Sequence, residues 1–206
     1  LVLLTYRPDY DAGWLADRRR LELRLDGLPP AAIRQIITDL LGEDESLVAL
    51  HDELPRRSGG NPLFIEEYVR SMVESGELLG QPGRYRRELR PGLATIPPTV
   101  RGVLSARIDR LAGADKLVLR TIAAIGEVAS VDLLERVTAM PADELRKALR
   151  RLEIAGLLVE RADAGELAYE FKHSLTQAVA YDTLLQRRRQ QLHLNILQAL
   201  KGSDDV

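Results

Sequence analysis

Signals that start and stop helices recur along this chain and favour short amphipathic helices joined by tight turns. Pro29-Pro30 precedes an apolar stripe that Gly42 closes, and Asn61-Pro62 opens another stripe that ends at Gly76. Proline suits the first position of a helix, asparagine caps it, and glycine terminates it. We therefore expect a mainly α chain.

The second half keeps these signals and adds a hairpin. Two strands, 157–160 and 167–171, flank the turn residues Asp163, Ala164 and Gly165. Three short helices followed by a hairpin predict a winged helix, and a smaller hairpin is expected around Gly83. The helices expected from these patterns cover residues 30–41, 45–54, 61–76, 99–111, 115–125, 131–138, 141–155, 174–185 and 188–200.

The first residues show a different pattern. Residues 1–5 form an unbroken apolar run, which is typical of a strand buried on both faces of a parallel sheet. A second strand is expected at 21–25, where leucines alternate with charged residues. Nothing else nearby supplies a sheet, so we interpret both as remnant strands of an α/β core whose earlier part is missing. The absence of an initiating Met fits a chain that begins within a longer protein.

Composition excludes several classes of function. The chain has no cysteine and three scattered histidines, which excludes disulfides and thiolate metal sites and makes a reducing cytoplasm the expected location. Its net charge of −2 provides no general attraction to nucleic acid or to an anionic membrane. No apolar stretch approaches the length of a membrane-spanning helix.

The residues of a complete ATPase site are also absent from the sequence. No Gly-x-x-x-x-Gly-Lys-[Ser/Thr] loop occurs, and no hydrophobic run ending in paired acidic residues is present to hold magnesium. The acidic pair Glu66-Glu67 falls inside an expected helix, where neighbours point in different directions. We interpret it as one structural and one solvated carboxylate, and we predict no catalytic residue in this chain.

Six short motifs in fixed order resemble one family, the predicted ATPase module of STAND proteins, which are AAA+-related signal-transduction ATPases. The resemblance is greatest to modules attached to bacterial class III adenylate cyclases and to LuxR-like or SARP-like transcription regulators. It covers nearly the whole chain and is carried by Leu-Leu-Thr-Tyr-Arg-Pro (3–8), Ser-Gly-Gly-Asn-Pro-Leu-Phe-Ile-Glu-Glu (58–67), Ile-Pro-Pro-Thr-Val (96–100), Ala-Arg-Ile-Asp-Arg-Leu (106–111), Glu-Phe-Lys-His-Ser-Leu (170–175) and Val-Ala-Tyr-Asp-Thr-Leu-Leu (179–185).

The resemblance implies four parts and a switching function. Residues 1–27 would end the nucleotide-binding core, 28–95 would form a helical lid and linker, and 96–173 a bridging helix with a winged helix. Residues 174–206 would lead to a missing downstream region. The chain would sense ATP and ADP, with magnesium held by the missing core, and would not be catalytic alone.

Four residues acquire roles through the resemblance. Arg7 is similar to the sensor arginine that approaches the γ-phosphate, a task suited to an always-charged guanidinium. Asn61 and Pro62 match the motif whose proline packs on the adenine side. His173 resembles the histidine that reaches the β-phosphate of ADP, where an imidazole can donate a hydrogen bond.

Each of these residues also has an interpretation without a ligand. Arg7 fits a solvated arginine in the turn before Pro8. Asn61 and Pro62 are explained as a helix cap and a first helical residue. His173 fits a half-buried histidine at a strand-to-helix junction.

Two alternative functions remain open for the chain. A DNA-binding winged helix would use the helix 141–155, whose four positive and three negative side chains favour a solvated surface over phosphate binding. A protein-interaction or self-associating module would use an apolar stripe on the last two helices, formed by Tyr181, Leu184, Leu185, Leu192, Ile196 and Leu200.

Overall fold

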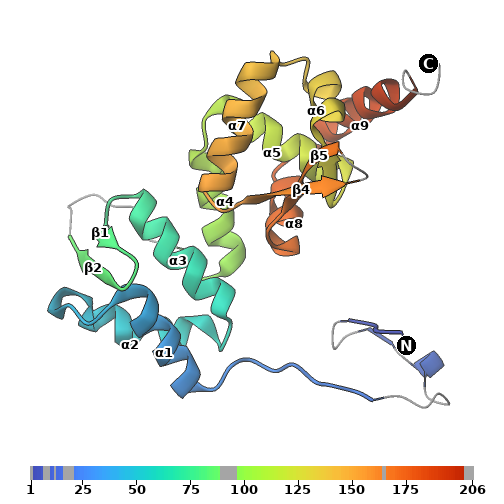
Figure 1. The fold of residues 1–206 in the computed structure, drawn as a ribbon. Helices are drawn as coiled ribbons and strands as arrows, with labels where there is room; N and C mark the ends of the chain where they lie inside the picture. Colours follow the sequence, from blue (N-terminus) through green and yellow to red (C-terminus); the bar gives the residue numbers. More distant parts are fainter. Residues whose placement is uncertain are drawn as a thin grey trace.

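The computed structural model describes residues 2–6, 10–11, 13–15, 21–88, 97–163 and 166–201. Figure 1 shows two neighbouring groups of helices, each with a small sheet, and one helix between them. Both sheets are antiparallel. The mainly α class predicted from the sequence is confirmed.

The N-terminal unit is a set of helices closed by a hairpin. Ile33, Ile37 and Leu41 recur on one face of its first helix and are buried in the core of this unit. The Gly83 N–H at the hairpin turn donates to Leu40 O at 2.8 Å, which ties the hairpin to that helix. The elements are α1 (Pro30–Leu41), the 3-10 turn η2 (Glu45–Leu47), α2 (Val48–Ser58), α3 (Pro62–Glu74), β1 (Leu78–Gln81) and β2 (Arg84–Arg87).

Helix α4 (Val100–Arg110) belongs to both halves of the molecule. Thr99 caps it, because its Oγ1 accepts a hydrogen bond from the Gly102 N–H at 3.1 Å. Val103 is buried in the core of the N-terminal unit, whereas Leu104 and Ile108 are buried in a second core. One helix therefore contributes side chains to two adjacent cores.

The second core lies in the C-terminal unit, which has the three helices and the hairpin that the sequence predicted and one further short strand. Ser130 caps α6, as its Oγ accepts from the Leu133 N–H. The strands form a sheet in the order β3-β5-β4, with Ala129 opposite Tyr169. The elements are α5 (Gly113–Ile125), β3 (Val128–Ser130), α6 (Val131–Thr138), α7 (Ala142–Ile154), β4 (Leu158–Asp163) and β5 (Glu166–Phe171).

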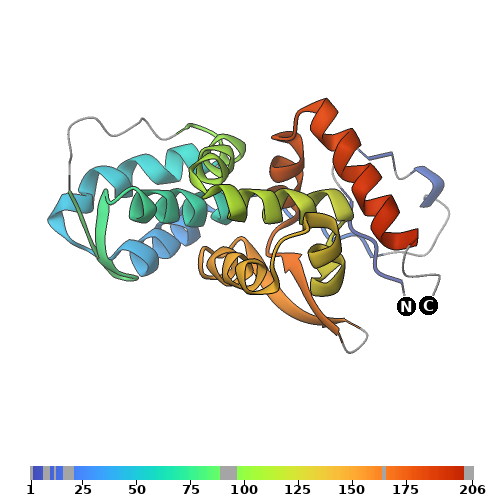
Figure 2. The same cartoon turned by 90° about the horizontal axis from the view of Figure 1, so that it is seen from above.

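Two further helices, α8 (Ser174–Asp182) and α9 (Gln186–Lys201), pack on this unit. Figure 2 shows α9 beside the C-terminal end of α5. The Arg136 guanidinium of α6 also donates a hydrogen bond to Ala199 O of α9 at 2.7 Å. Of the apolar stripe expected on these helices, Leu184, Leu192 and Ile196 are buried against Ala124 and Val137, so these three do not present a surface to a partner. Leu185 and Leu200 remain exposed.

The two strands predicted near the N-terminus are not strands in the structure. Residues 2–6 and 21–28 have neither helix nor strand, and the side chains of Leu21, Leu23 and Leu25 are exposed. A strand needs a neighbour to receive its backbone hydrogen bonds, and no strand of the described residues lies beside them. Within this region, only the 3-10 turn η1 (Gly13–Leu15) is regular among the described residues.

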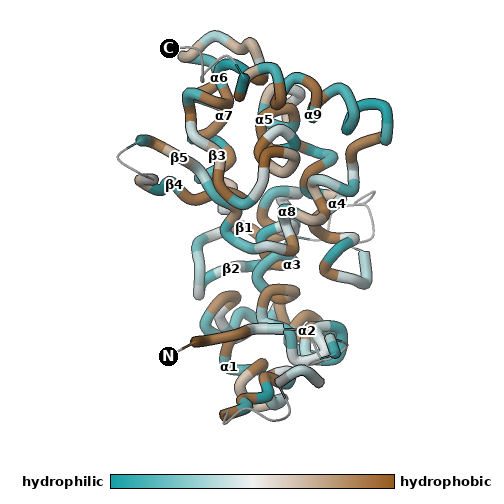
Figure 3. Tube along the Cα trace, turned by 90° about the vertical axis from the view of Figure 1, so that its right-hand side faces the viewer, coloured by the Kyte–Doolittle hydropathy of each residue, from teal (hydrophilic) through white to brown (hydrophobic). Residues whose placement is uncertain are grey.

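Apolar and polar positions are interleaved along the helices, as Figure 3 shows in brown and teal. This is the pattern of helices that bury one face and expose the other. Among the described helices, none combines the length and the apolar character that crossing a bilayer requires.

Candidate functional site

Asn61 and Pro62 form the start of α3, as their interpretation as a helix cap predicts. The Asn61 Oδ1 accepts a hydrogen bond from the Leu63 N–H at 3.0 Å, and Pro62 occupies the first helical turn. Both side chains retain solvent exposure. The capping hydrogen bond accounts for an asparagine at this position without any ligand. It also fixes the position of the Pro62 ring at the start of α3.

We expect Asn61→Ala to lower the free energy of unfolding by about 1 kcal/mol, the usual effect of removing a helix cap. Urea unfolding followed by circular dichroism measures this loss. Asn61→Asp is the matched control, because a carboxylate caps equally well and should leave the midpoint nearly unchanged. An equal loss in both variants would contradict the capping role.

The two glycines before this cap serve different purposes. Gly59 ends α2 with a left-handed backbone and has open space where a Cβ would lie. Gly60 also has a positive φ, of 81°, but its Cβ position is 2.9 Å from the backbone of Gly27 and Leu28. The Gly60 O accepts from the Leu28 N–H at 2.8 Å. Gly60 therefore permits the chain before α1 to pack against the start of α3.

His173 lies between β5 and α8, at the strand-to-helix junction that the sequence predicted. Its backbone O accepts from the Thr176 N–H at 2.9 Å, so the main chain of His173 begins α8. Its ring is partly buried, and Nε2 is buried without a hydrogen-bond partner among the described residues. An unpaired buried ring nitrogen is unusual in a purely structural histidine, because desolvation without a hydrogen bond costs free energy.

The segments that hold Pro62 and His173 approach each other. Lys172, next to His173, places its Nζ 4.0 Å from the Glu66 Oε2, and Glu66 lies one helical turn beyond Pro62. This contact between two half-exposed side chains links the region at the start of α3 to the β5–α8 junction. Arg7 lies outside the described residues, so its position relative to this region stays a prediction.

A buried arginine that the sequence analysis did not single out joins the two units. Arg107 of α4 is 2% exposed and forms ion pairs with Glu67 and Glu74 of α3. Its Nη2 also donates to Ala155 O at 2.9 Å. Burial alone would lower the pKa of Arg107, but its hydrogen bonds and charge interactions with Glu74 and Glu67 raise it, so the guanidinium stays charged.

The interpretation of the acidic pair as one structural and one solvated carboxylate is confirmed. Glu67 is 3% exposed and paired with Arg107, whereas the Glu66 side chain is 40% exposed. The sequence contained a signal that Arg107 is buried and paired. It falls on the same helical face as Leu104 and Ile108, and a charge on an apolar face is rarely buried without a partner.

Arg70 adds a second link between the units. Its Nη1 donates to Ala155 O, at the end of α7, over a distance of 2.7 Å. The next residue, Gly156, has a φ of 66°, and a Cβ there would lie 1.6 Å from Arg70 Nη1. We call these contacts, together with those of Arg107 and the Glu66–Lys172 pair, the interunit contact.

The positive side chains of α7 are mostly engaged within the protein. Arg146 pairs with Asp143, Arg150 with Glu153, and Arg151 with the buried Asp115 at 2.6 Å. The hydrogen bond to Asp115 raises the pKa of Arg151 above its ordinary value. This distribution of charge does not favour α7 as a DNA-recognition helix, because paired arginines neutralise few phosphates.

No group of three His, Asp or Glu side chains among the described residues is placed to hold a metal ion. The described residues therefore do not fit magnesium. What they offer is a buried ring nitrogen, a proline ring at a helix start and a half-exposed ion pair. The Pro62 ring and the ion pair can contact a ligand in this structure, whereas the Nε2 of His173 is buried and would first have to be uncovered.

Comparison with curated proteins finds a similarity to part of a longer protein. The chain is 29% identical over 206 residues to an uncharacterized protein of Rhizobium meliloti (strain 1021), covering 97% of this chain and 19% of that protein. The chain thus spans about a fifth of the length of the curated relative it matches. No family model matches the chain.

Proposed function

We propose that this chain is the lid and winged-helix portion of a STAND-type signal-transduction regulator that switches between ADP and ATP. The observation that carries the proposal is the buried, unpaired Nε2 of His173 at a junction whose neighbour Lys172 reaches α3. Two of the positions that the family resemblance assigns to the nucleotide, Pro62 and His173, lie on segments that approach each other. The similarity to part of a much longer protein is consistent with a module within a larger regulator.

In this proposal the two units contribute different groups to ADP. The Pro62 ring offers an apolar surface for the base, and its position is fixed by the Asn61 cap. The His173 Nε2 is buried in this structure, so a movement that uncovers it would let it donate a hydrogen bond to a phosphate oxygen; that bond would satisfy a nitrogen without a partner among the described residues. Such a bond gains strength from the charge of the phosphate.

The remaining parts of a nucleotide site must come from outside this chain. The sequence has no glycine-rich phosphate loop, and the described residues offer no magnesium ligands. The bound nucleotide would supply a phosphate whose charge differs between ADP and ATP. A ligand shifts a conformational equilibrium only by its differential affinity for the two states. The proposed switch is therefore a change in the closure of the lid and winged helix over a core held elsewhere, with Arg7 as the sensor of the γ-phosphate.

The test uses the full-length protein that contains this chain. We expect His173→Ala to weaken ADP binding about tenfold or more, the effect of losing a hydrogen bond to a charged group. Isothermal titration with ADP measures the Kd, and release of co-purified nucleotide on denaturation gives a second reading. The matched control is His193→Ala, because His193 is exposed and bonds only Tyr181 among the described residues.

An unchanged ADP affinity in the His173 variant, with folding intact by circular dichroism, would refute the role of this residue. Failure of the full-length protein to bind either nucleotide would refute the switch as a whole. Equal losses in the His173 and His193 variants would indicate a general loss of structure and would also count against a specific phosphate contact.

A further inference from the structure

Helix α4 is packed into both units of the molecule at once. Val103 is buried in the core of the N-terminal unit, and Leu104 and Ile108 are buried in the core of the C-terminal unit. Val100 packs against both cores. Because internal hydrogen bonds fix the shape of a helix and protein cores are close-packed, neither unit can turn about α4 without unpacking one core.

The end of α7 is held by two arginines from other helices. Arg70 of α3 donates from Nη1 to Ala155 O at 2.7 Å, and Arg107 of α4 donates from Nη2 to the same oxygen at 2.9 Å. Ala155 is the C-cap of α7. The last carbonyls of a helix carry partial negative charge, so two cations there are favourable. We call this pair of hydrogen bonds the arginine clamp.

The arginine clamp is anchored in the N-terminal unit. Arg107 is 2% exposed and also binds Glu67 and Glu74, both on α3. Its planar guanidinium thus contacts three acceptors in a fixed geometry. If Arg107 followed α7 away from α3, the buried carboxylate of Glu67 would be left without its partner, which is costly. The clamp therefore ties the direction of α7 to that of α3.

The turn after α7 fits closely around the clamp. At Gly156 a Cβ would lie 1.6 Å from Arg70 Nη1, so a side chain there would displace the guanidinium. A second contact between α3 and α4 lies nearby, where Arg110 Nη2 donates to the buried Ser71 Oγ at 2.8 Å. These contacts leave little freedom for the two units to slide past each other.

From these contacts we propose that the two units form one rigid body, with the arginine clamp fixing α7 against α3. A ligand or partner that moves one unit would then move the other with it. The inference concerns contacts within this chain and does not depend on the nucleotide switch. If the switch operates, the lid and the winged helix would close over the core together.

Residual dipolar couplings of the ¹⁵N-labelled 206-residue chain, measured by NMR in a dilute aligning medium, test this inference. The amide couplings of residues 30–87 and of residues 113–201 are fitted separately. For one rigid body we expect two alignment tensors of the same magnitude and orientation. A clearly smaller tensor for one unit would show that the units move independently, and it would overturn the proposal.

Two variants test whether the arginine clamp couples the units. Arg70→Met removes one clamp bond and leaves the buried pair of Arg107 and Glu67 in place, so the fold should persist. Arg107→Lys keeps a charge beside Glu67 but replaces the planar fork by a compact ammonium group. We expect the tensor of one unit to lose magnitude relative to the other in both variants. Equal tensors in both variants would show that the clamp is not the coupling element.

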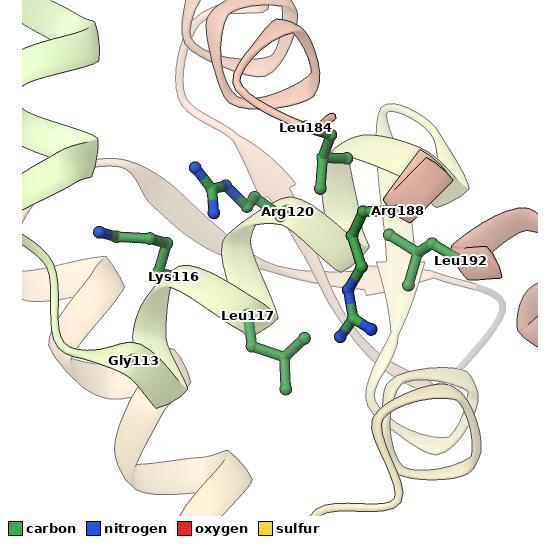
Figure 4. A pocket seen from close by; sticks show the side chains of 7 residues that line it. All are labelled: Gly113, Lys116, Leu117, Arg120, Leu184, Arg188 and Leu192. Carbon is green, nitrogen blue, oxygen red and sulfur yellow. The ribbon is translucent and has the colours of Figure 1, made fainter. Parts of the chain in front are cut away.

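Arg120→Met is the matched control. Figure 4 shows Arg120 on α5, beside a pocket that lies within the C-terminal unit. Its Nε donates to Thr183 Oγ1 at 3.0 Å, at the end of α8, so the substitution removes a guanidinium contact inside one unit. The two tensors should stay equal. The same divergence in the Arg70 and Arg120 variants would indicate a general loosening of the protein and would contradict the clamp.

Discussion

Replacing Arg107 with Met is expected to lower the free energy of unfolding by about 3–5 kcal/mol, the largest effect of any substitution considered for this chain. The reason is that the substitution leaves the buried carboxylate of Glu67 without its partner. Glu67 is 3% exposed, and its carboxylate would lose its partner while remaining buried. An unpaired buried charge is costly because neither water nor a counter-charge compensates for its desolvation.

The contacts of Arg107 with other elements extend the expected loss of stability beyond the Arg107–Glu67 pair. The same guanidinium binds Glu74 and Ala155 O, so it connects α3 to the end of α7. We therefore expect the Arg107 variant to weaken the interunit contact as well as the fold. Hydrogen exchange should show greater opening of α3 and α4 than of β4 and β5, whose pairing does not involve this residue.

Two further variants, a control and a rescue, test this prediction. Arg101→Met removes an arginine from the same helix, but its pair with Asp182 is exposed, so we expect a loss of about 0–1 kcal/mol. Adding Glu67→Met to the Arg107 variant should recover most of the stability, because it removes the unpaired charge. With the Glu67→Met single variant, urea unfolding of the wild type, the two single variants and the double variant gives the coupling energy between Arg107 and Glu67. A similar loss for Arg101 and Arg107 would contradict the buried-pair argument.

Gly60→Ala is expected to cost about 2–4 kcal/mol, which is the second large effect. The left-handed backbone at Gly60 disfavours any side chain. Its Cβ would also meet backbone atoms of Gly27 and Leu28 at 2.9 Å, and backbone cannot move aside as a flexible side chain can. The hydrogen bond from Leu28 to Gly60 should be lost with this contact.

The neighbouring glycine separates these two causes. Gly59 has a positive φ as well, but nothing lies within 4 Å of its Cβ position. Gly59→Ala should therefore cost only the backbone strain, about 1–2 kcal/mol. Thermal and urea unfolding compare the two variants directly. Equal losses of stability in the two variants would show that the close packing of Gly60 against Gly27 and Leu28 contributes nothing. The proposed reason for a glycine at position 60 would then be wrong.

Local sequence patterns were sufficient for most helix positions. Asn61 was expected to cap a helix, and helices were expected to begin at residues 99 and 131. Asn61, Thr99 and Ser130 each accept a hydrogen bond from a backbone N–H two or three residues later. A cap acts over a few residues, so neighbouring sequence contains all the information it needs. The short strand β3 was missed because it has three residues, too few to show a period, and it forms by pairing with β5.

The same local reasoning failed at the N-terminus. An apolar run at residues 1–5 and alternating leucines at 21–25 have the composition of strands, but a strand forms only when another strand accepts its hydrogen bonds. In the described part of the chain no such partner lies beside them. The assignment of these residues to a nucleotide-binding core rests on the family resemblance and stays a prediction.

The sequence by itself determined the mainly α class and the positions of most helices and their caps, because these depend on side chains acting on nearby backbone. Only the tertiary structure decided which charges are buried and which segments meet. Arg107 and Glu67 are 40 residues apart, and Arg70 and Ala155 are 85 apart. Such contacts depend on the packing of α3 against α4 and α7, which no local pattern specifies. The buried nitrogen of His173 likewise became visible only when distant elements were brought together.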